Sequence, residues 1–262
     1  MTPAMKESGF WEHAEALRKV LLQSVAVIAG LMCIYFAVMP ELFDRVILAP
    51  CRTGFPLYSL LDDIAGESAS MHQDIRLVNI QLASQFFIHM TTSMWLGVIT
   101  AFPVVLYLLW GFISPGLYEH EKRGAGVVLA GGTLMFYLGV AVGYWLVFPL
   151  TLRFLAGYQL STLIPNQISL DSYIDNFMML VLVMGIVFEL PVAAWMLGRL
   201  GVLRRGFFHT YRRHAIVALL IFAAVVTPTG DPFTLMVVFL PIYILWEGSA
   251  LTVPRYENKI SN

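Results

Sequence analysis

Glu189 is the residue whose position most clearly predicts chemistry, because it lies deep in the apolar stretch Gly-Ile-Val-Phe-Glu-Leu-Pro-Val. A carboxylate at this depth in a bilayer is costly unless it is protonated, paired or facing water. Pro191 lacks an N–H group and leaves the carbonyl group of Val187 without its helical donor, which adds polarity nearby. We favour a polar site facing a cavity. The alternative is a protonated carboxyl group whose hydrogen bonds are satisfied within the bundle.

A second acidic group lies in a short connection, residues 114–123, which reads Ser-Pro-Gly-Leu-Tyr-Glu-His-Glu-Lys-Arg. Its carboxylates, Glu119 and Glu121, could each receive a guanidinium group through two parallel hydrogen bonds, a geometry that an ammonium group cannot copy. The residues equally allow a solvated turn with Lys122 and Arg123 as counter-ions. Spacing alone leaves both interpretations open.

Two further carboxylates have positional interpretations. Glu247 lies one turn from the end of the last apolar stretch, where it can reach lipid headgroups or a neighbouring arginine. Asp231 is followed by Pro232, the pattern of a helix N-cap with proline at the first helical position. We expect both carboxylates to position helix ends.

The N-terminal segment is amphipathic. Its apolar residues recur at helical spacing, while Glu15 and Lys19 form an i,i+4 pair on another face. The apolar set is Phe10, Ala14, Leu17 and Leu21. Spacing alone predicts an interfacial helix that leads into the first apolar stretch.

The composition requires that these residues be positioned by membrane helices. Of 262 residues, 58% are apolar and 13% are charged, and the mean hydropathy is +0.75. A soluble domain carries about 25% charged residues, so an ordinary soluble enzyme is excluded, as is a disordered chain. The net charge of −1 indicates no nucleic-acid partner, and two cysteines make no disulfide framework.

Six apolar stretches approach the roughly 20 residues that a transmembrane helix needs. They are residues 20–39, about 86–113, 126–150, 173–197, 215–226 and 233–251. The first stretch, ended by Pro40, is too long for a cleavable signal peptide and is expected to be an uncleaved anchor. The fifth stretch covers only about 18 Å, which predicts a locally thinned bilayer, or else snorkelling flanks. Pro241 interrupts the sixth.

The basic residues predict the orientation. Twelve of the sixteen lysines and arginines fall on the side of the chain termini, and positive charge stays cytoplasmic. We therefore predict an all-α integral membrane protein with both termini inside and a single polytopic domain, residues 1–262. Its extramembrane parts are a cytoplasmic N-terminus (1–19), an external capping segment with short amphipathic helices (40–85) and cytoplasmic loops (114–125 and 198–214).

The sequence contains no enzyme signature. Gly-x-Ser-x-Gly, His-Glu-x-x-His and a phosphate-binding glycine loop are all absent. Cys33 and Cys51 fall in different compartments, so no metal site and no cofactor are predicted. An intramembrane protease would need a Ser–His or paired-Asp site within the spans, and none is visible. A faint echo between residues 102–107 and 190–195 allows an alternative: a proton-coupled small-solute secondary transporter with Glu189 as the titrating group.

In combination, these pieces resemble the TatC family, the multi-spanning subunit of the twin-arginine protein translocase. The acidic connection and the Phe-Glu-x-Pro stretch are the most specific parts of a resemblance that covers nearly the whole chain. Its pieces are residues 49–50, 102–103, 110–123, 136–139, 147–150, 185–192, 227–228 and 231–233. The resemblance implies a curved, glove-like, concave bundle of six helices with short fifth and sixth helices.

The resemblance also implies a receptor for folded proteins that carry an Arg-Arg signal peptide. The family's arginine-contacting Glu maps onto Glu121, beside Glu119. The family's N-terminal pattern, His-x-x-Glu-Leu-Arg-x-Arg, is matched by His13, Leu17 and Arg18, but Ala16 replaces its Glu and Val20 its second Arg. Glu15, one residue earlier, is the candidate substitute.

The other family positions are placed in the same way. Glu189 matches the family's buried carboxylate, Asp231 its external acidic residue, and Pro50 and Thr227 its partner or structural positions. Leu235 replaces a Gln that is frequent in the family. The implied partners are single-span TatA-type subunits along spans five and six, TatB-type subunits as a further candidate, membrane lipid and further copies of the chain in a larger complex. The implied setting is the bacterial cytoplasmic (inner) membrane, with the proton-motive force as energy source.

Overall fold

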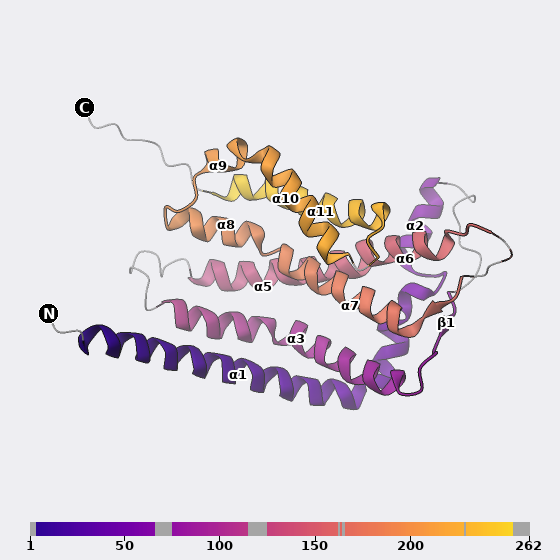
Figure 1. The fold of residues 1–262 in the computed structure, drawn as a ribbon, viewed down its shortest axis with the longest axis horizontal. Helices are drawn as coiled ribbons and strands as arrows, with labels where there is room; N and C mark the ends of the chain where they lie inside the picture. Colours follow the sequence, from indigo (N-terminus) through magenta and orange to yellow (C-terminus); the bar gives the residue numbers. More distant parts are fainter. Residues whose placement is uncertain are drawn as a thin grey trace. The chain divides into compact units, whose positions relative to one another are not determined.

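A computed structural model describes residues 4–65, 75–114, 125–161, 163, 166–227 and 229–253 (Figure 1). The chain divides into two compact units. The first contains Met1–Met39 and His89–Thr133, and the second contains Pro40–Ile88 and Leu134–Asn262. Glu119 and Glu121 lie outside the described residues.

The first unit is built on two long helices, α1 (Ala4–Leu42) and α3 (Ser84–Ile113). Gly97 brings their backbones together, because a Cβ atom at this position would lie 3.1 Å from the Met32 nitrogen. The hydroxyl groups of Tyr35 and Thr100 hydrogen-bond at 2.7 Å, and the Nε2 atom of His89 lies 2.8 Å from the Phe36 carbonyl oxygen. These two polar contacts and the close approach at Gly97 join α1 to α3.

The second unit holds the remaining elements in chain order. They are the π-helical turn η1 (Phe43–Ile47), the 3₁₀ turn η2 (Ala49–Cys51), α2 (Pro56–Ala65), β1 (Leu77–Val78), the π-helical turn η5 (Gly143–Val147), α6 (Phe148–Gly157), β2 (Ile168–Ser169), α7 (Leu170–Val187), α8 (Leu190–Arg199), α9 (Arg205–Thr210), α10 (Arg212–Val226) and α11 (Pro232–Thr252). Helix α5 (Ala125–Val142) begins in the first unit and ends in the second. The strands pair in parallel, Leu77 with Ile168 and Val78 with Ser169.

Helix α7 is the centre of the second unit. Small residues allow close contact, since a Cβ atom at Gly143 would lie 2.8 Å from the Val181 Cα atom. Toward one end, Phe148 packs edge-to-face on Tyr173 and on Phe177. The buried Tyr173 hydroxyl donates to the Ile47 carbonyl oxygen at 2.5 Å, which ties η1 to α7.

Five helices of the described chain are long and apolar enough to cross a membrane by length and composition. The predicted all-α membrane fold is therefore confirmed, whereas the count of six spans and the side of the termini stay predictions. Helix α10, on the fifth stretch, has 15 residues and is short as expected. Helix α11 has 21 residues, whereas each of the other four candidate spans has 30 or more, so the sixth helix is also comparatively short.

The structure differs from the expected helix boundaries at three proline residues. Helix α1 runs past Pro40 to Leu42, and α11 continues through Pro241. A proline removes one donor and kinks a helix, but neighbouring helices can tolerate it in a membrane protein. The fourth stretch, by contrast, is broken into α7 and α8 just before Pro191.

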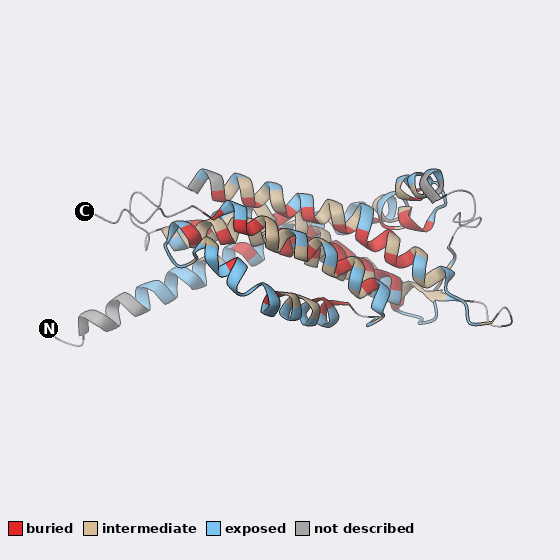
Figure 2. Ribbon diagram, turned by 90° about the horizontal axis from the view of Figure 1, so that it is seen from above, coloured by how far each residue is buried: buried red, intermediate tan, exposed pale blue. Residues whose placement is uncertain are grey.

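Exposed residues occur along most of the helices (Figure 2), and many of them have large apolar side chains. In the most apolar window of the first helix, only 6% of the residues are buried. Exposed apolar helix faces of this extent need lipid or another protein against them. This exposure agrees with the membrane assignment.

Candidate functional site

Glu189 lies at the break between α7 and α8. The Phe188 N–H still donates to the Met184 carbonyl oxygen at 3.0 Å, but the Glu189 N–H donates to Ile186 at 3.1 Å, which tightens the last turn. Pro191 at the start of α8 has no N–H group for the Val187 carbonyl, so the α-helical ladder ends here. The sequence therefore places the carboxylate at a helix N-cap within a span.

The Glu189 side chain is half-buried, and its Oε1 atom is buried with no hydrogen-bond partner among the described residues. A buried acceptor without a donor costs about 1–3 kcal/mol. The Glu189 Oε1 atom can therefore accept a hydrogen bond from a donor outside the described residues. Among the residues that the structure describes, no lysine or arginine forms an ion pair with Glu189.

Glu247 on α11 pairs with Arg212 at the start of α10. The Arg212 Nε atom lies 2.7 Å from the Glu247 Oε1 atom, and Tyr243 joins them by accepting from Arg212 Nη2 at 2.8 Å and donating to Glu247 at 3.0 Å. The hydrogen bond to Tyr243 and the charge of Glu247 raise the pKa of Arg212. This network joins the start of α10 to the far end of α11, through residues that lie 31 or more positions apart in the sequence.

Asp231 caps α11 as its sequence pattern predicts. Its Oδ1 atom accepts from the Thr234 N–H at 2.7 Å, and its Oδ2 atom accepts from the Thr229 hydroxyl at 2.6 Å. Partial burial raises the pKa of Asp231, but these hydrogen bonds outweigh it, so the pKa falls below its ordinary value of 3.8. The carboxylate is thus held ionised at the helix N-terminus.

Two other predicted positions are buried in the second unit. Thr227 ends α10, where its hydroxyl donates to the Ala224 carbonyl at 3.4 Å. Pro50 lies in η2, and its carbonyl oxygen accepts from the buried Tyr58 hydroxyl at 2.8 Å. Both residues make contacts within the chain that shape turns at helix ends.

The N-terminal residues of the candidate arginine-binding site lie beside the start of the acidic connection. The His13 ring stacks on the Phe112 ring, with the centroids 4.4 Å apart. Glu15 and Arg18 are exposed on the same helix. Phe112 is nine residues before Glu121, so α1 lies next to the base of the segment that carries the predicted arginine receptor.

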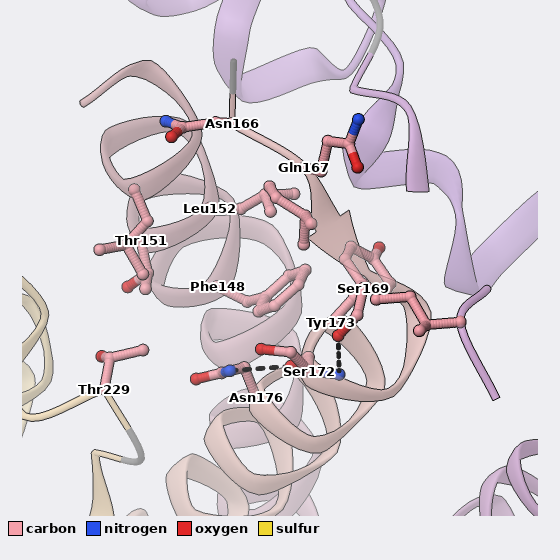
Figure 3. A pocket seen from close by; sticks show the side chains of 13 residues that line it. Phe148, Thr151, Leu152, Asn166, Gln167, Ser169, Ser172, Tyr173, Asn176 and Thr229 are labelled. Carbon is pink, nitrogen blue, oxygen red and sulfur yellow. Dashed lines mark hydrogen bonds between the residues drawn. The ribbon is translucent and has the colours of Figure 1, made fainter. Parts of the chain in front are cut away.

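A pocket of about 450 Å³ lies among α6, β2 and α7, with Ile80 and Thr229 also at its wall (Figure 3). The Thr151 hydroxyl and the Asn176 Oδ1 atom are buried in this region and have no hydrogen-bond partner among the described residues. The sequence prediction missed this pocket because its polar residues are uncharged and interspersed with apolar ones, without a motif. Its other lining residues are Phe148, Leu152, Leu155, Asn166, Gln167, Ile168, Ser169, Ser172 and Tyr173.

These features define a multi-pass helical membrane protein with a half-buried carboxylate at a helix break. The family model for the Sec-independent protein translocase protein (TatC) matches residues 12–241. The TatC protein of Blattabacterium sp. subsp. Periplaneta americana is 32% identical over 250 residues, covering 93% of this chain and 94% of that protein. The chain therefore belongs to the TatC family.

Other relatives and solved structures agree. The TatC protein of Deinococcus radiodurans is 32% identical over 94% of this chain and 85% of its own length. A crystal structure of the twin-arginine translocase receptor TatC matches with a TM-score of 0.73 at 30% identity, covering 92% of this chain and 97% of that one. A crystal structure of the receptor in DDM matches with a TM-score of 0.75 at 29% identity, covering 93% of this chain and 100% of that one.

Proposed function

We propose that this protein is the signal-peptide receptor and core subunit of a twin-arginine translocase, which exports folded proteins across the bacterial inner membrane. The observation that carries the proposal is the similarity to the solved twin-arginine translocase receptor, at 30% identity over 92% of the chain. The relatives that match it are named as Sec-independent translocase proteins. The small-solute transporter has no such support.

Recognition is assigned to the acidic connection and the N-terminal helix. In this proposal Glu121, with Glu119 nearby, accepts the guanidinium groups of the two signal-peptide arginines through bidentate hydrogen bonds. The stacking of His13 on Phe112 supports a role for the N-terminal helix, because it holds Glu15 and Arg18 near the base of this connection. Glu15 then supplies the carboxylate that the family pattern has one residue later.

Glu189 is assigned to a later step. The apolar part of the signal peptide lies near this carboxylate, and a donor from the peptide or from a partner helix satisfies its Oε1 atom. The unpartnered state of that atom among the described residues supports this assignment. Export itself breaks no covalent bond, so the protein acts without side-chain catalysis, metal or cofactor and draws on the proton-motive force.

Single-span TatA-type subunits, and TatB-type subunits where present, are assigned to the faces of α10 and α11. Two apolar stripes support this placement, because their members recur every four residues and are exposed. They are Val217, Ile221 and Val225 on α10 and Met236, Leu240 and Ile244 on α11. The helix ends and turns beside these faces are held by four residues: Pro50, Thr227, Asp231 and Glu247. In this proposal each copy of the chain has six spans and both termini in the cytoplasm. Several copies assemble into the larger complex.

The test is export of a folded reporter in cells that lack this chain and are then complemented. We expect export of a reporter with Arg-Arg in its signal peptide and none with Lys-Lys. Glu121→Gln should weaken signal-peptide crosslinking about tenfold or more, as expected for the loss of a charge-assisted pair. Asp63→Asn, which removes an exposed carboxylate on α2, is the matched control and should have no effect. Unchanged crosslinking in Glu121→Gln would remove the recognition role.

A further inference from the structure

The connection from α8 to α10 carries charge of a single sign. Residues 190–230 contain five arginines and no aspartate or glutamate. Arg199 ends α8, Arg204 and Arg205 begin α9, and Arg212 and Arg213 begin α10. All five arginines therefore lie at the ends of three consecutive helices of the second unit.

This region is packed against the bundle and is not a loose loop. Phe208 of α9 is buried against Ala194, Ala250 and Val253, and its ring lies 4.8 Å from that of Trp246. Gly201 adopts φ +74°, a left-handed conformation that favours glycine, and this turn lets the chain fold back after α8. The buried contacts of Phe208 thus hold α9, which carries Arg205, against the bundle.

The arginines differ in their partners. Arg212 is neutralised by Glu247, as described above. Arg199 is exposed and lies over the Trp195 ring at 4.7 Å. Arg204 and Arg213 are exposed and Arg205 is partly exposed, and none of these three makes an ion pair or a side-chain hydrogen bond to another described residue. Among the described residues, therefore, most of the positive charge has no counter-charge.

Aromatic side chains mark the depth of this region in a bilayer. Phe207 and Tyr211 are exposed beside the arginines, and Trp195 lies at the end of α8. Tryptophan and tyrosine concentrate at the level of the lipid headgroups. Guanidinium groups at this level meet phosphate, which they bind through paired hydrogen bonds.

We propose that Arg199, Arg204, Arg205 and Arg213, here called the basic patch, bind the headgroups of anionic phospholipids. An uncharged or zwitterionic surface leaves the excess positive charge unbalanced, whereas an anionic lipid balances it. Each basic residue near an anionic membrane surface contributes about 1 kcal/mol. A role limited to setting the orientation during insertion would not require lipid selectivity in the folded protein.

The experiment uses the full chain purified in detergent and an equimolar mixture of phosphatidylglycerol and phosphatidylcholine. Retained lipid is measured by native mass spectrometry. Wild-type protein should retain phosphatidylglycerol preferentially, and Arg204→Gln/Arg205→Gln/Arg213→Gln should lose this preference. At about fivefold per arginine, the triple substitution should reduce it about a hundredfold.

The matched control is Arg45→Gln/Arg52→Gln/Arg76→Gln, which removes the same charge from positions outside residues 190–230. It should keep the wild-type preference. Equal retention of both lipids by the wild type, or an equal loss in the two triple variants, overturns the proposal. Inorganic phosphate at matched ionic strength should not displace the lipid, and full displacement would assign the patch to free phosphate. Thermal unfolding in phosphatidylcholine alone verifies that each variant is folded.

Discussion

Substituting Gly139 by alanine should disturb the packing that positions Glu189. A Cβ atom at Gly139 would lie 2.8 Å from the Phe188 Cβ atom and 2.9 Å from the Gly185 Cα atom, and it would also overlap the Met184 carbonyl oxygen. Real Cβ atoms essentially never approach heavy atoms to less than 3.0 Å. Because two of the three neighbours are backbone atoms, no rotamer change can relieve the overlap, and α5 and α7 must separate.

Gly131 on the same helix provides the matched control, since a Cβ atom there has no neighbour within 4 Å. Each substitution gains about 0.8–1.0 kcal/mol of helix propensity, so this gain cancels in the comparison. Overpacking costs about 1–3 kcal/mol, and a backbone obstacle places Gly139→Ala in the upper half of that range. We therefore expect Gly139→Ala to be about 2–3 kcal/mol less stable than Gly131→Ala.

The assay is thermal unfolding of the two purified variants in the same detergent. At about 2–4 °C per kcal/mol for a chain of this size, Gly139→Ala should melt about 5–10 °C below Gly131→Ala. Export activity should fall in the same variant, because a shift of α7 moves Glu189. Equal melting temperatures would refute the close α5–α7 contact. A stability loss with normal export would refute the link between this contact and Glu189.

Two further predictions concern buried and capping hydrogen bonds. Tyr173→Phe should cost about 1–3 kcal/mol, because it leaves the Ile47 carbonyl without its donor, and an unchanged melting temperature would contradict this. For Asp231, the pKa lies below 3.8 in the folded protein, so its stabilising effect should be complete above pH 3.8 and lost as the pH falls through the lower folded value. Asp231→Asn should keep the cap but reduce this acid dependence. Asp231→Ala should lower the free energy of unfolding by about 1 kcal/mol at neutral pH. Melting curves of the wild type and the two variants, recorded from neutral to acid pH, test both statements.

The sequence was sufficient for features that depend on local composition and spacing. Long apolar stretches predicted membrane helices because they exceed what a soluble core needs. The pair Asp231-Pro232 predicted a helix start, and the structure has the cap there. Glu189 is a candidate site residue because a carboxylate is rare within an apolar stretch, and its role stays a prediction. In each case the information lies within a few neighbouring residues.

Only the tertiary structure decided which distant residues meet. The pairing of Arg212 with Glu247 and the stacking of His13 on Phe112 join segments far apart in the sequence. Likewise, Gly131 and Gly139 look alike in the sequence, yet only Gly139 lies against another backbone. Whether a proline ends a helix also depends on its neighbours: α11 passes through Pro241, whereas the chain breaks just before Pro191. Helix formation is governed by near neighbours, but these contacts depend on how the helices pack, which no short stretch of sequence specifies.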